Sequence, residues 1–474
     1  MASGKTPKFI LLITSDQQRI DTLGVYGSKT AKSPHLDRLA SEGTVFERAY
    51  CNNSVCIPSR ASIATGRYTH QHGVEYMEDV VDSTPGLPAR EKTFMERLQE
   101  KGIKTAAFGK MHLYPLPPRG FDERKLTGGQ GARWDAADGS PLGPGPLGSE
   151  YAEWLEKRRP GAYELIYEQR RSDEYKKYKS AVTSVLKFEE YVDTWTAGNT
   201  IEYFRKHKDS KTPVFAWCGF CNPHTPFDAP KPYDTMYDPA KIEIPATFKL
   251  DMSDRPAFYM ERQKIASGGL SPELLKRMKA YYLGLCTMID DLSGRIFDNL
   301  KELGIWDETL VIFTTDHGEL MGDYGLFNKN CFFEPVINVP LLIKPAGETP
   351  NCRKTAGLCE LMDIAPTILD YAGIEKPAGM PAESLRPAVE GRSFGKELIL
   401  SEYMEGDRKR RGKCIRTERY KYIFWLPGKE EELYDLNKDP EERKNLSRSG
   451  EYSGIVSEMR VKMQAKLSSS ERRV

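Results

Sequence analysis

The sequence lacks both a long apolar run and an excess of one charge. Its 474 residues include 69 Lys and Arg against 68 Asp and Glu, which gives a net charge of +1. Without a basic surplus, the chain has no electrostatic basis for binding nucleic acid or an anionic membrane surface. No apolar stretch approaches the roughly 18–20 residues that a membrane span needs. We therefore expect neither a nucleic-acid partner nor a membrane partner.

The N-terminus and the cysteines also lack familiar patterns. Residues 1–8 lead into only five strongly apolar residues, which is too short a run for a secretory signal peptide. The sequence thus predicts a cytoplasmic protein, or a periplasmic or secreted one if a signal segment has been removed. The nine cysteines are odd in number and scattered, which argues against a disulfide framework and leaves one of them as a candidate for a special role.

What the sequence does contain is an alternation of apolar runs and amphipathic segments. Residues 9–13, 105–108, 214–219 and 310–315 are predicted strands, and the first is apolar on both faces, as in a buried parallel strand. The strongest helix signal spans residues 271–304, which begin with Ser-Pro, end at Gly and repeat apolar residues every three to four positions. This alternation predicts an α/β fold with a largely parallel sheet.

Polar side chains follow each of the four predicted strands. They are Asp16 and Gln17, Lys110 and His112, His224, and Asp316 and His317. Because ligands bind at the carboxyl ends of strands in open α/β sheets, we expect these four segments to converge on one site.

Two stretches rich in Gly and Pro interrupt the alternation. Residues 126–149 are predicted to form a long surface excursion. A second passage, residues 373–392, is typical of a domain boundary. We therefore divide the chain into a larger α/β domain, residues 1–375, and a smaller C-terminal α+β domain, residues 376–474.

A cysteine at the predicted start of a helix is the leading candidate for chemistry. Pro58 suits the first turn of a helix that begins near Cys56, and Gly66 suits its end. A thiol at a helix N-terminus beside a cation, here Arg60, is expected to have a lowered pKa. Cys56 is therefore a candidate reactive residue, and the alternative is a small buried side chain.

Residues 56–60, Cys-Ile-Pro-Ser-Arg, and the Thr-Gly pair at 65–66 match the motif C-x-P-S-R-x(4)-T-G of the type I sulfatases, which the chain resembles. The similarity extends in the family's order over nearly the whole chain, through Asp16-Gln17, Gly109-Lys-Met-His112, Pro223-His224, Asp316-His317-Gly318, residues 325–329, 416–421 and 432–435. It implies an alkaline-phosphatase-like fold. Such a fold has a mixed, largely parallel sheet flanked by helices and a smaller C-terminal domain with an antiparallel sheet.

The resemblance also implies that a maturation enzyme oxidises Cys56 to formylglycine. The hydrated aldehyde supplies a geminal diol, and one of its hydroxyls attacks the sulfur of a sulfate ester. A divalent cation lowers the pKa of that hydroxyl and polarises a sulfate oxygen. Loss of the second hydroxyl's proton then expels sulfate, a step that a plain serine could not take.

The family's cation ligands fall on Asp16, Gln17, residue 56, Asp316 and His317. The commonest pattern has an aspartate in place of Gln17 and an asparagine in place of His317. The departures resemble iduronate-sulfatase-like members and phosphonate monoester hydrolases. Oxygen ligands suit calcium, whereas an imidazole favours manganese or another transition ion. We expect one Ca²⁺, with Mn²⁺ as the alternative.

The remaining family positions imply roles for five side chains. Lys110 and Lys329 match the two lysines that hold the sulfate. Arg60 would orient the diol at residue 56. His112 matches the histidine that assists the diol's loss of a proton, and His224 matches the one that faces the leaving-group oxygen as a candidate general acid.

The leading hypothesis is hydrolysis of a sulfate ester on a carbohydrate or small organic molecule, by a chain that could form a homo-oligomer. The alternative is a phosphonate monoester or phosphodiester hydrolase of the same fold, which Gln17 and His317 suggest. Lys110 argues against it, because the Gly-Lys-x-His arrangement resembles the sulfatases. A non-catalytic sulfoglycan-binding protein and a hydrolase that uses an unmodified Cys56 thiolate are remoter alternatives.

Overall fold

The computed structural model describes residues 6–76, 86–114, 117–127, 150–267, 270–347, 352–405 and 409–470. Most of the predicted excursion at 126–149 lies outside the described residues. No helix of the described part is long and apolar enough to cross a membrane.

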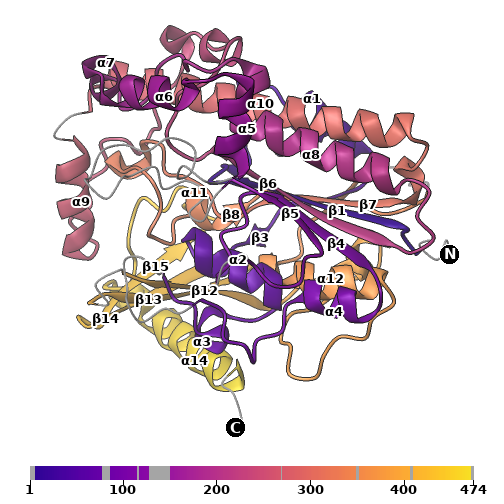
Figure 1. Ribbon diagram of the computed structural model, residues 1–474. Helices are drawn as coiled ribbons and strands as arrows, with labels where there is room; N and C mark the ends of the chain where they lie inside the picture. The colour runs from indigo at the N-terminus through magenta and orange to yellow at the C-terminus, as the bar shows by residue number, and fades with distance from the viewer. Residues whose placement is uncertain are drawn as a thin grey trace.

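An eight-stranded mixed sheet lies at the centre of the molecule, in the order β10-β2-β9-β7-β1-β6-β4-β5 (Figure 1). β1 pairs in parallel with β6 and β7, and β4 pairs in parallel with β6 and β5, whereas β9 runs antiparallel to β7 and β2. The strands are β1 (Phe9–Asp16), β2 (Thr44–Phe46), β4 (Lys104–Gly109), β5 (Glu123–Leu126), β6 (Val214–Pro223), β7 (Thr309–Thr315), β9 (Leu341–Lys344) and β10 (Arg353–Thr355). The predicted α/β fold with a largely parallel sheet is confirmed.

Helices cover both faces of this sheet, because successive residues of the central strands point to opposite faces and are apolar on both. Leu11 and Ile13 of β1 pack with α1 (Pro34–Ser41), α8 (Val192–His207) and α10 (Pro272–Glu302), which lie above the sheet in Figure 1. Ile10 and Leu12 face α2 (Cys56–Thr65), α4 (Phe94–Glu100) and α12 (Ile364–Tyr371) below it. The other helices are α3 (Thr69–His72), α5 (Glu150–Arg158), α6 (Ala162–Arg171), α7 (Asp173–Lys177), α9 (Ala257–Ser267), α11 (Glu334–Ile337), α13 (Arg386–Val389) and α14 (Ser453–Ser470).

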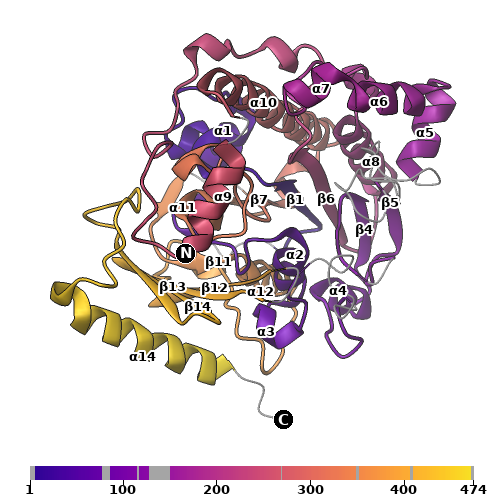
Figure 2. The ribbon, with the colours of Figure 1, turned by 90° about the vertical axis from the view of Figure 1, so that its left-hand side faces the viewer.

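A second, four-stranded antiparallel sheet lies toward the C-terminus. Its strands, in order, are β12 (Leu398–Met404), β13 (Arg411–Thr417), β14 (Tyr420–Leu426) and β15 (Glu430–Asp435), and α14 lies alongside them (Figure 2). A small third sheet joins β11 (Cys359–Glu360), β3 (Ala49–Tyr50) and β8 (Asn338–Val339). The smaller antiparallel sheet that the family resemblance implies is present, and the exact boundary between residues 375 and 376 stays a prediction.

A buried charged cluster joins the antiparallel sheet to α11 of the larger part of the chain. The Lys421 ammonium on β14 lies 2.8 Å from Glu334 and 2.7 Å from Glu442 and donates to the Phe332 carbonyl. The backbone N–H of Glu334 in turn donates to the Glu442 carboxylate. Burial and the neighbouring Glu334 charge raise the pKa of Glu442 to about 7.

The variant Glu442→Gln should flatten the pH dependence of stability. An unfolded glutamate has a pKa of about 4.3, so between roughly pH 4.3 and 7 the native state holds a proton that the unfolded chain releases. The free energy of unfolding therefore falls as pH rises through this window, by at most about 1.4 kcal/mol per pH unit. Calorimetry at pH 5 and pH 8 should show a larger loss for the parent protein than for the variant.

The exposed neighbour Glu441, replaced by Gln, is the matched control and should keep the parent's pH profile. Equal losses for the parent and Glu442→Gln would contradict this explanation of the cluster.

Candidate active site

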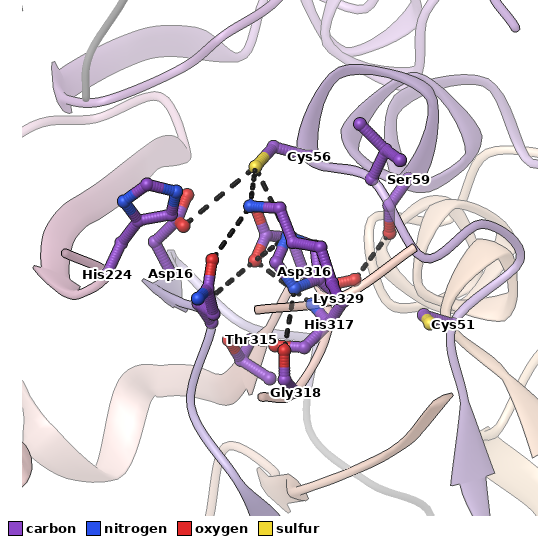
Figure 3. A network of polar contacts seen from close by, with 12 residues as sticks. Asp16, Cys51, Cys56, Ser59, His224, Thr315, Asp316, His317, Gly318 and Lys329 are labelled. Carbon is purple, nitrogen blue, oxygen red and sulfur yellow. Dashed lines mark hydrogen bonds and ion pairs between the residues drawn. The ribbon is translucent and has the colours of Figure 1, made fainter. Parts of the chain in front are cut away.

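The four strand ends converge at one edge of the central sheet, as predicted. Asp16 ends β1, and Asp316 follows its parallel neighbour β7 directly. Lys110 follows β4 and His224 follows β6, the strand that lies between β4 and β1. The first residue of α2, Cys56, points into this group of side chains (Figure 3).

The Cys56 sulfur lies at the centre of the site. It is 3.2 Å from His317 Nε2, 3.0 Å from Lys329 Nζ and 3.9 Å from Asp16 Oδ1. The helix that carries it begins at Cys56 itself and ends before Gly66, whose φ of +66° is the left-handed conformation that suits a glycine cap. The predicted helix bounds are thus confirmed, and they place residue 56 where these three side chains face it.

The expected lowering of the Cys56 pKa is wrong. Burial raises the pKa of this thiol and the Asp16 charge adds to the increase, while Lys329 and Lys110 act in the opposite direction without reversing it. The guanidinium of the motif arginine, Arg60, donates its hydrogen bonds to carboxylates and not to the sulfur. This environment gives no support to an unmodified thiolate nucleophile.

Arg60 bridges the two aspartates from inside the protein. Its Nε donates to Asp316 Oδ2 at 2.9 Å, its Nη2 donates to Asp16 Oδ2 at 3.0 Å, and its Nη1 donates to the Lys110 carbonyl at 3.0 Å. All three ionised side chains have no exposed surface. Burial alone would raise the pKa of Asp16, but Lys110, His224 and Arg60 outweigh it and hold that pKa well below its usual range.

His317 presents a nitrogen lone pair to the site. Its Nδ1 lies 2.9 Å from the Gly318 carbonyl, which accepts only from a protonated nitrogen and so leaves Nε2 unprotonated in the neutral ring. Burial lowers the pKa of His317 to about 4, so the ring is neutral at pH 7. One potential ligand atom from each of Asp16, Cys56, Asp316 and His317 lies within 4.8 Å of the others. Two carboxylates and a neutral imidazole form a donor set that fits a divalent cation.

The Gln17 amide has a fixed orientation. Its Oε1 accepts from Lys329 Nζ at 2.8 Å, and its Nε2 donates to the Glu319 carboxylate. Because an ammonium only donates and a carboxylate only accepts, the amide oxygen must face Lys329. Glu319, a buried acid that the sequence reasoning missed, also accepts from the backbone N–H groups of Met321 and Asn328. The position of Glu319, three residues after Asp316, was the feature of the sequence that could have placed it near the site.

The lysines and histidines at the other family positions surround this centre. Lys110 Nζ lies 2.7 Å from Asp16 Oδ2. His224 is half-buried, and its Nδ1 donates to the Thr225 carbonyl at 2.6 Å, which leaves Nε2 available. His112 is buried, and its Nδ1 has no hydrogen-bond partner among the described residues. Burial and nearby lysines lower the pKa of both histidines well below the usual value.

The Sulfatase family matches residues 8–374 of the chain. The chain belongs to this family. A second family, described as N-sulphoglucosamine sulphohydrolase, C-terminal, matches residues 322–469. The arylsulfatase of Clostridium perfringens (strain 13 / Type A) is 32% identical over 460 residues, which are 95% of this chain and 92% of that relative.

Two further relatives come from the wider superfamily. The multifunctional alkaline phosphatase superfamily protein PehA of Trinickia caryophylli is 29% identical over 515 residues, covering 95% of this chain and 93% of that protein. The crystal structure of phosphonate monoester hydrolase of Agrobacterium radiobacter superimposes with a TM-score of 0.78 at 25% identity, covering 97% of this chain and 96% of that chain. The sulfatase is thus a sulfuric ester hydrolase with an alkaline-phosphatase-like fold, as predicted.

The variant Glu319→Gln should weaken the site without unfolding it. Its new amide N–H group would oppose Gln17 Nε2, so the Gln17 amide must flip and present N–H groups to the Lys329 ammonium. We expect the apparent affinity for Ca²⁺ or Mn²⁺ and the sulfatase activity to fall about 10- to 100-fold, as for other groups that orient metal ligands. The measurement is a titration of chelator-treated enzyme with each cation, followed by activity.

The exposed Glu164 on α6, replaced by Gln, is the control and should titrate like the parent. Unchanged cation affinity in Glu319→Gln would show that Glu319 does not position Gln17.

Proposed function

We propose that this sulfatase hydrolyses its sulfate ester with formylglycine at position 56 and one divalent cation. The cluster of Asp16, Cys56, Asp316 and His317, with ligand atoms within 4.8 Å of one another, carries the proposal. All four side chains are buried at the carboxyl end of the sheet, where ligands of α/β enzymes bind. The substrate would be a sulfated small molecule or saccharide, and a formylglycine-generating enzyme would be the maturation partner.

The cation would be held by Asp16, Gln17, Asp316 and His317 together with residue 56. When bound, it supplies a Lewis acid that polarises a sulfate oxygen and lowers the pKa of the attacking hydroxyl of residue 56. The carboxylate and amide oxygens favour Ca²⁺, and the Nε2 lone pair of His317 makes Mn²⁺ the alternative.

Lys110 and Lys329 would bind the sulfate, while Arg60 stays paired with the two aspartates. Arg60, Lys110 and Lys329 carry three positive charges beside the two negative charges of Asp16 and Asp316. Lys329 lies 3.0 Å from the residue 56 side chain, so a sulfate that is attacked from there falls within reach of its ammonium. In a buried site such cations stabilise charge that develops on the sulfate oxygens.

The two histidines would move protons on opposite sides of the reaction. The Nδ1–H of His224 is bound to the Thr225 carbonyl, so its Nε2 is the atom that can donate to the leaving-group oxygen. The anionic sulfate group of the substrate would favour the protonated ring that this step requires. His112, held neutral by burial, can accept the proton that the second hydroxyl of residue 56 loses.

Mass spectrometry of the peptide that contains residue 56 tests the nucleophile. Active protein should show an aldehyde in place of the thiol, and Cys56→Ser should lose at least about 100-fold in sulfatase kcat, since a serine ester cannot expel sulfate by collapse of a diol. Cys51→Ser, at a second buried cysteine, is the control. Full activity in protein that carries only intact cysteine would refute the formylglycine mechanism.

A substrate panel tests the reaction class. Gln17, His317 and the likeness to a phosphonate monoester hydrolase favour phosphorus esters as the second candidate. Because the Gly-Lys-x-His arrangement at residues 109–112 resembles the sulfatases, we expect kcat/KM for 4-nitrophenyl sulfate to exceed that for a phosphonate monoester and a phosphodiester by at least about tenfold. A higher kcat/KM for either phosphorus ester would reverse the assignment, and sulfate binding without turnover would indicate a sulfoglycan-binding protein.

A further inference from the structure

A cavity of about 490 Å³ adjoins the proposed site, and Glu319 is part of its lining. Thr225, which lines it, follows His224, the proposed donor to the leaving-group oxygen. Asn328 and Asn330 line it on either side of Lys329. A volume of a few hundred Å³ is typical of a pocket for one small organic molecule. The cavity is therefore positioned to hold the part of the substrate that carries the sulfate.

The inner wall of this cavity is apolar. Phe227, Leu270, Met278 and Leu326 are buried and line it, and Ile265 of α9, 81% exposed, stands at the rim. This apolar part offers contact area to a flat body such as an aromatic ring, while the polar side chains in the lining, among them Glu319, Asn328 and Asn330, suit polar substituents on that ring.

Two cations line the same cavity, and their partners differ. Arg262 of α9 donates to the backbone carbonyls of Lys329 and Asn330, so its guanidinium is engaged within the protein. Lys179 is exposed, and its ammonium makes no hydrogen bond or ion pair with any residue in the described part of the chain. Lys179 is thus the lining cation whose charge is available to a ligand.

The turn that contains Lys179 is fixed by contacts with residues from other elements of the fold. Lys179 has a φ of +47°, a conformation that non-glycine residues seldom adopt. The hydroxyl of the next residue, Ser180, accepts from the Phe227 N–H at 2.9 Å. Arg277 of α10 donates to the Ala181 carbonyl at 2.8 Å and stacks over the Tyr178 ring at 4.0 Å. A strained, braced backbone beside a free side chain is typical of a binding position.

We propose that this cavity is the leaving-group subsite and that Lys179 binds a second anionic group of the substrate. The inference rests on the proposed function. The substrate class is then a sulfate ester on an apolar, ring-bearing molecule with a second acidic substituent, such as a carboxylate or another sulfate. Lys179 acts as a specificity residue and takes no part in bond breaking.

Two esters that differ in one charge test the subsite: 4-sulfooxybenzoate and its methyl ester. The ratio of their kcat/KM values, carboxylate over methyl ester, should fall about fivefold in Lys179→Met, which is the effect of one exposed ion pair. The fall should lie in KM, and Lys179→Arg should restore most of the ratio. In the parent enzyme the ratio should shrink in about 1 M NaCl, where the screening length is about 3 Å.

Lys176→Met is the matched control, because Lys176 is an exposed lysine of α7 that does not line the cavity; its ratio should equal the parent's. If Lys179→Met hydrolyses both esters with the parent's ratio, the subsite is refuted and the proposed function stands. If the parent enzyme hydrolyses a sulfated saccharide but neither these esters nor 4-nitrophenyl sulfate, the subsite is refuted alone; if it hydrolyses no sulfate ester of either kind, the proposed function fails and the subsite fails with it.

Discussion

The arrangement of the site depends on one buried guanidinium between two buried carboxylates. β1 and β7 run parallel in register, so their ends bring Asp16 and Asp316 together without solvent. Two such carboxylates could not both stay ionised unless a cation lay between them. Arg60 supplies that cation from α2, four residues after Cys56, and residues four apart share a helix face. The ion pairs that stabilise the aspartates therefore also fix residue 56 above them.

A series of hydrogen bonds and an ion pair connects the site around Asp316 to the C-terminal antiparallel sheet. Gly318 and Glu319, which come directly after Asp316 and His317, donate their backbone N–H groups to the carbonyls of Val336 and Pro335, respectively. Glu334, which precedes Pro335, forms an ion pair with Lys421 of β14. The antiparallel sheet thus supports the loop that carries Asp316, His317 and Glu319. Removing this support would loosen the site although none of its residues enters it.

The sequence predicted the features that short-range patterns determine. The strands, the long helix and the polar residues at strand ends follow from apolar periodicity, and the helix of residue 56 follows from Pro58 and Gly66. The Cys56 pKa was mispredicted because it depends on burial and on Asp16, which is 40 residues away in the chain. Glu319 was missed because it meets Gln17 across 302 residues, and Lys179 because Phe227 and Arg277 brace its turn from distant elements.

Although the net charge of the chain is near zero, the site contains three cations, and these differ in how fully their N–H groups are used by other residues of the protein. Arg60 is fully occupied, because its three nitrogens donate to Asp16, Asp316 and backbone carbonyls. Lys110 is shared with Asp16. Among the residues that the structure describes, the Lys329 ammonium donates to an amide oxygen and to the residue 56 sulfur, and an ammonium has three N–H groups, so one is left for a ligand. In a buried site each charge acts more strongly than in water. Within the proposed mechanism, Lys329, the cation with the weakest internal partners, is therefore the one best placed to hold the sulfate.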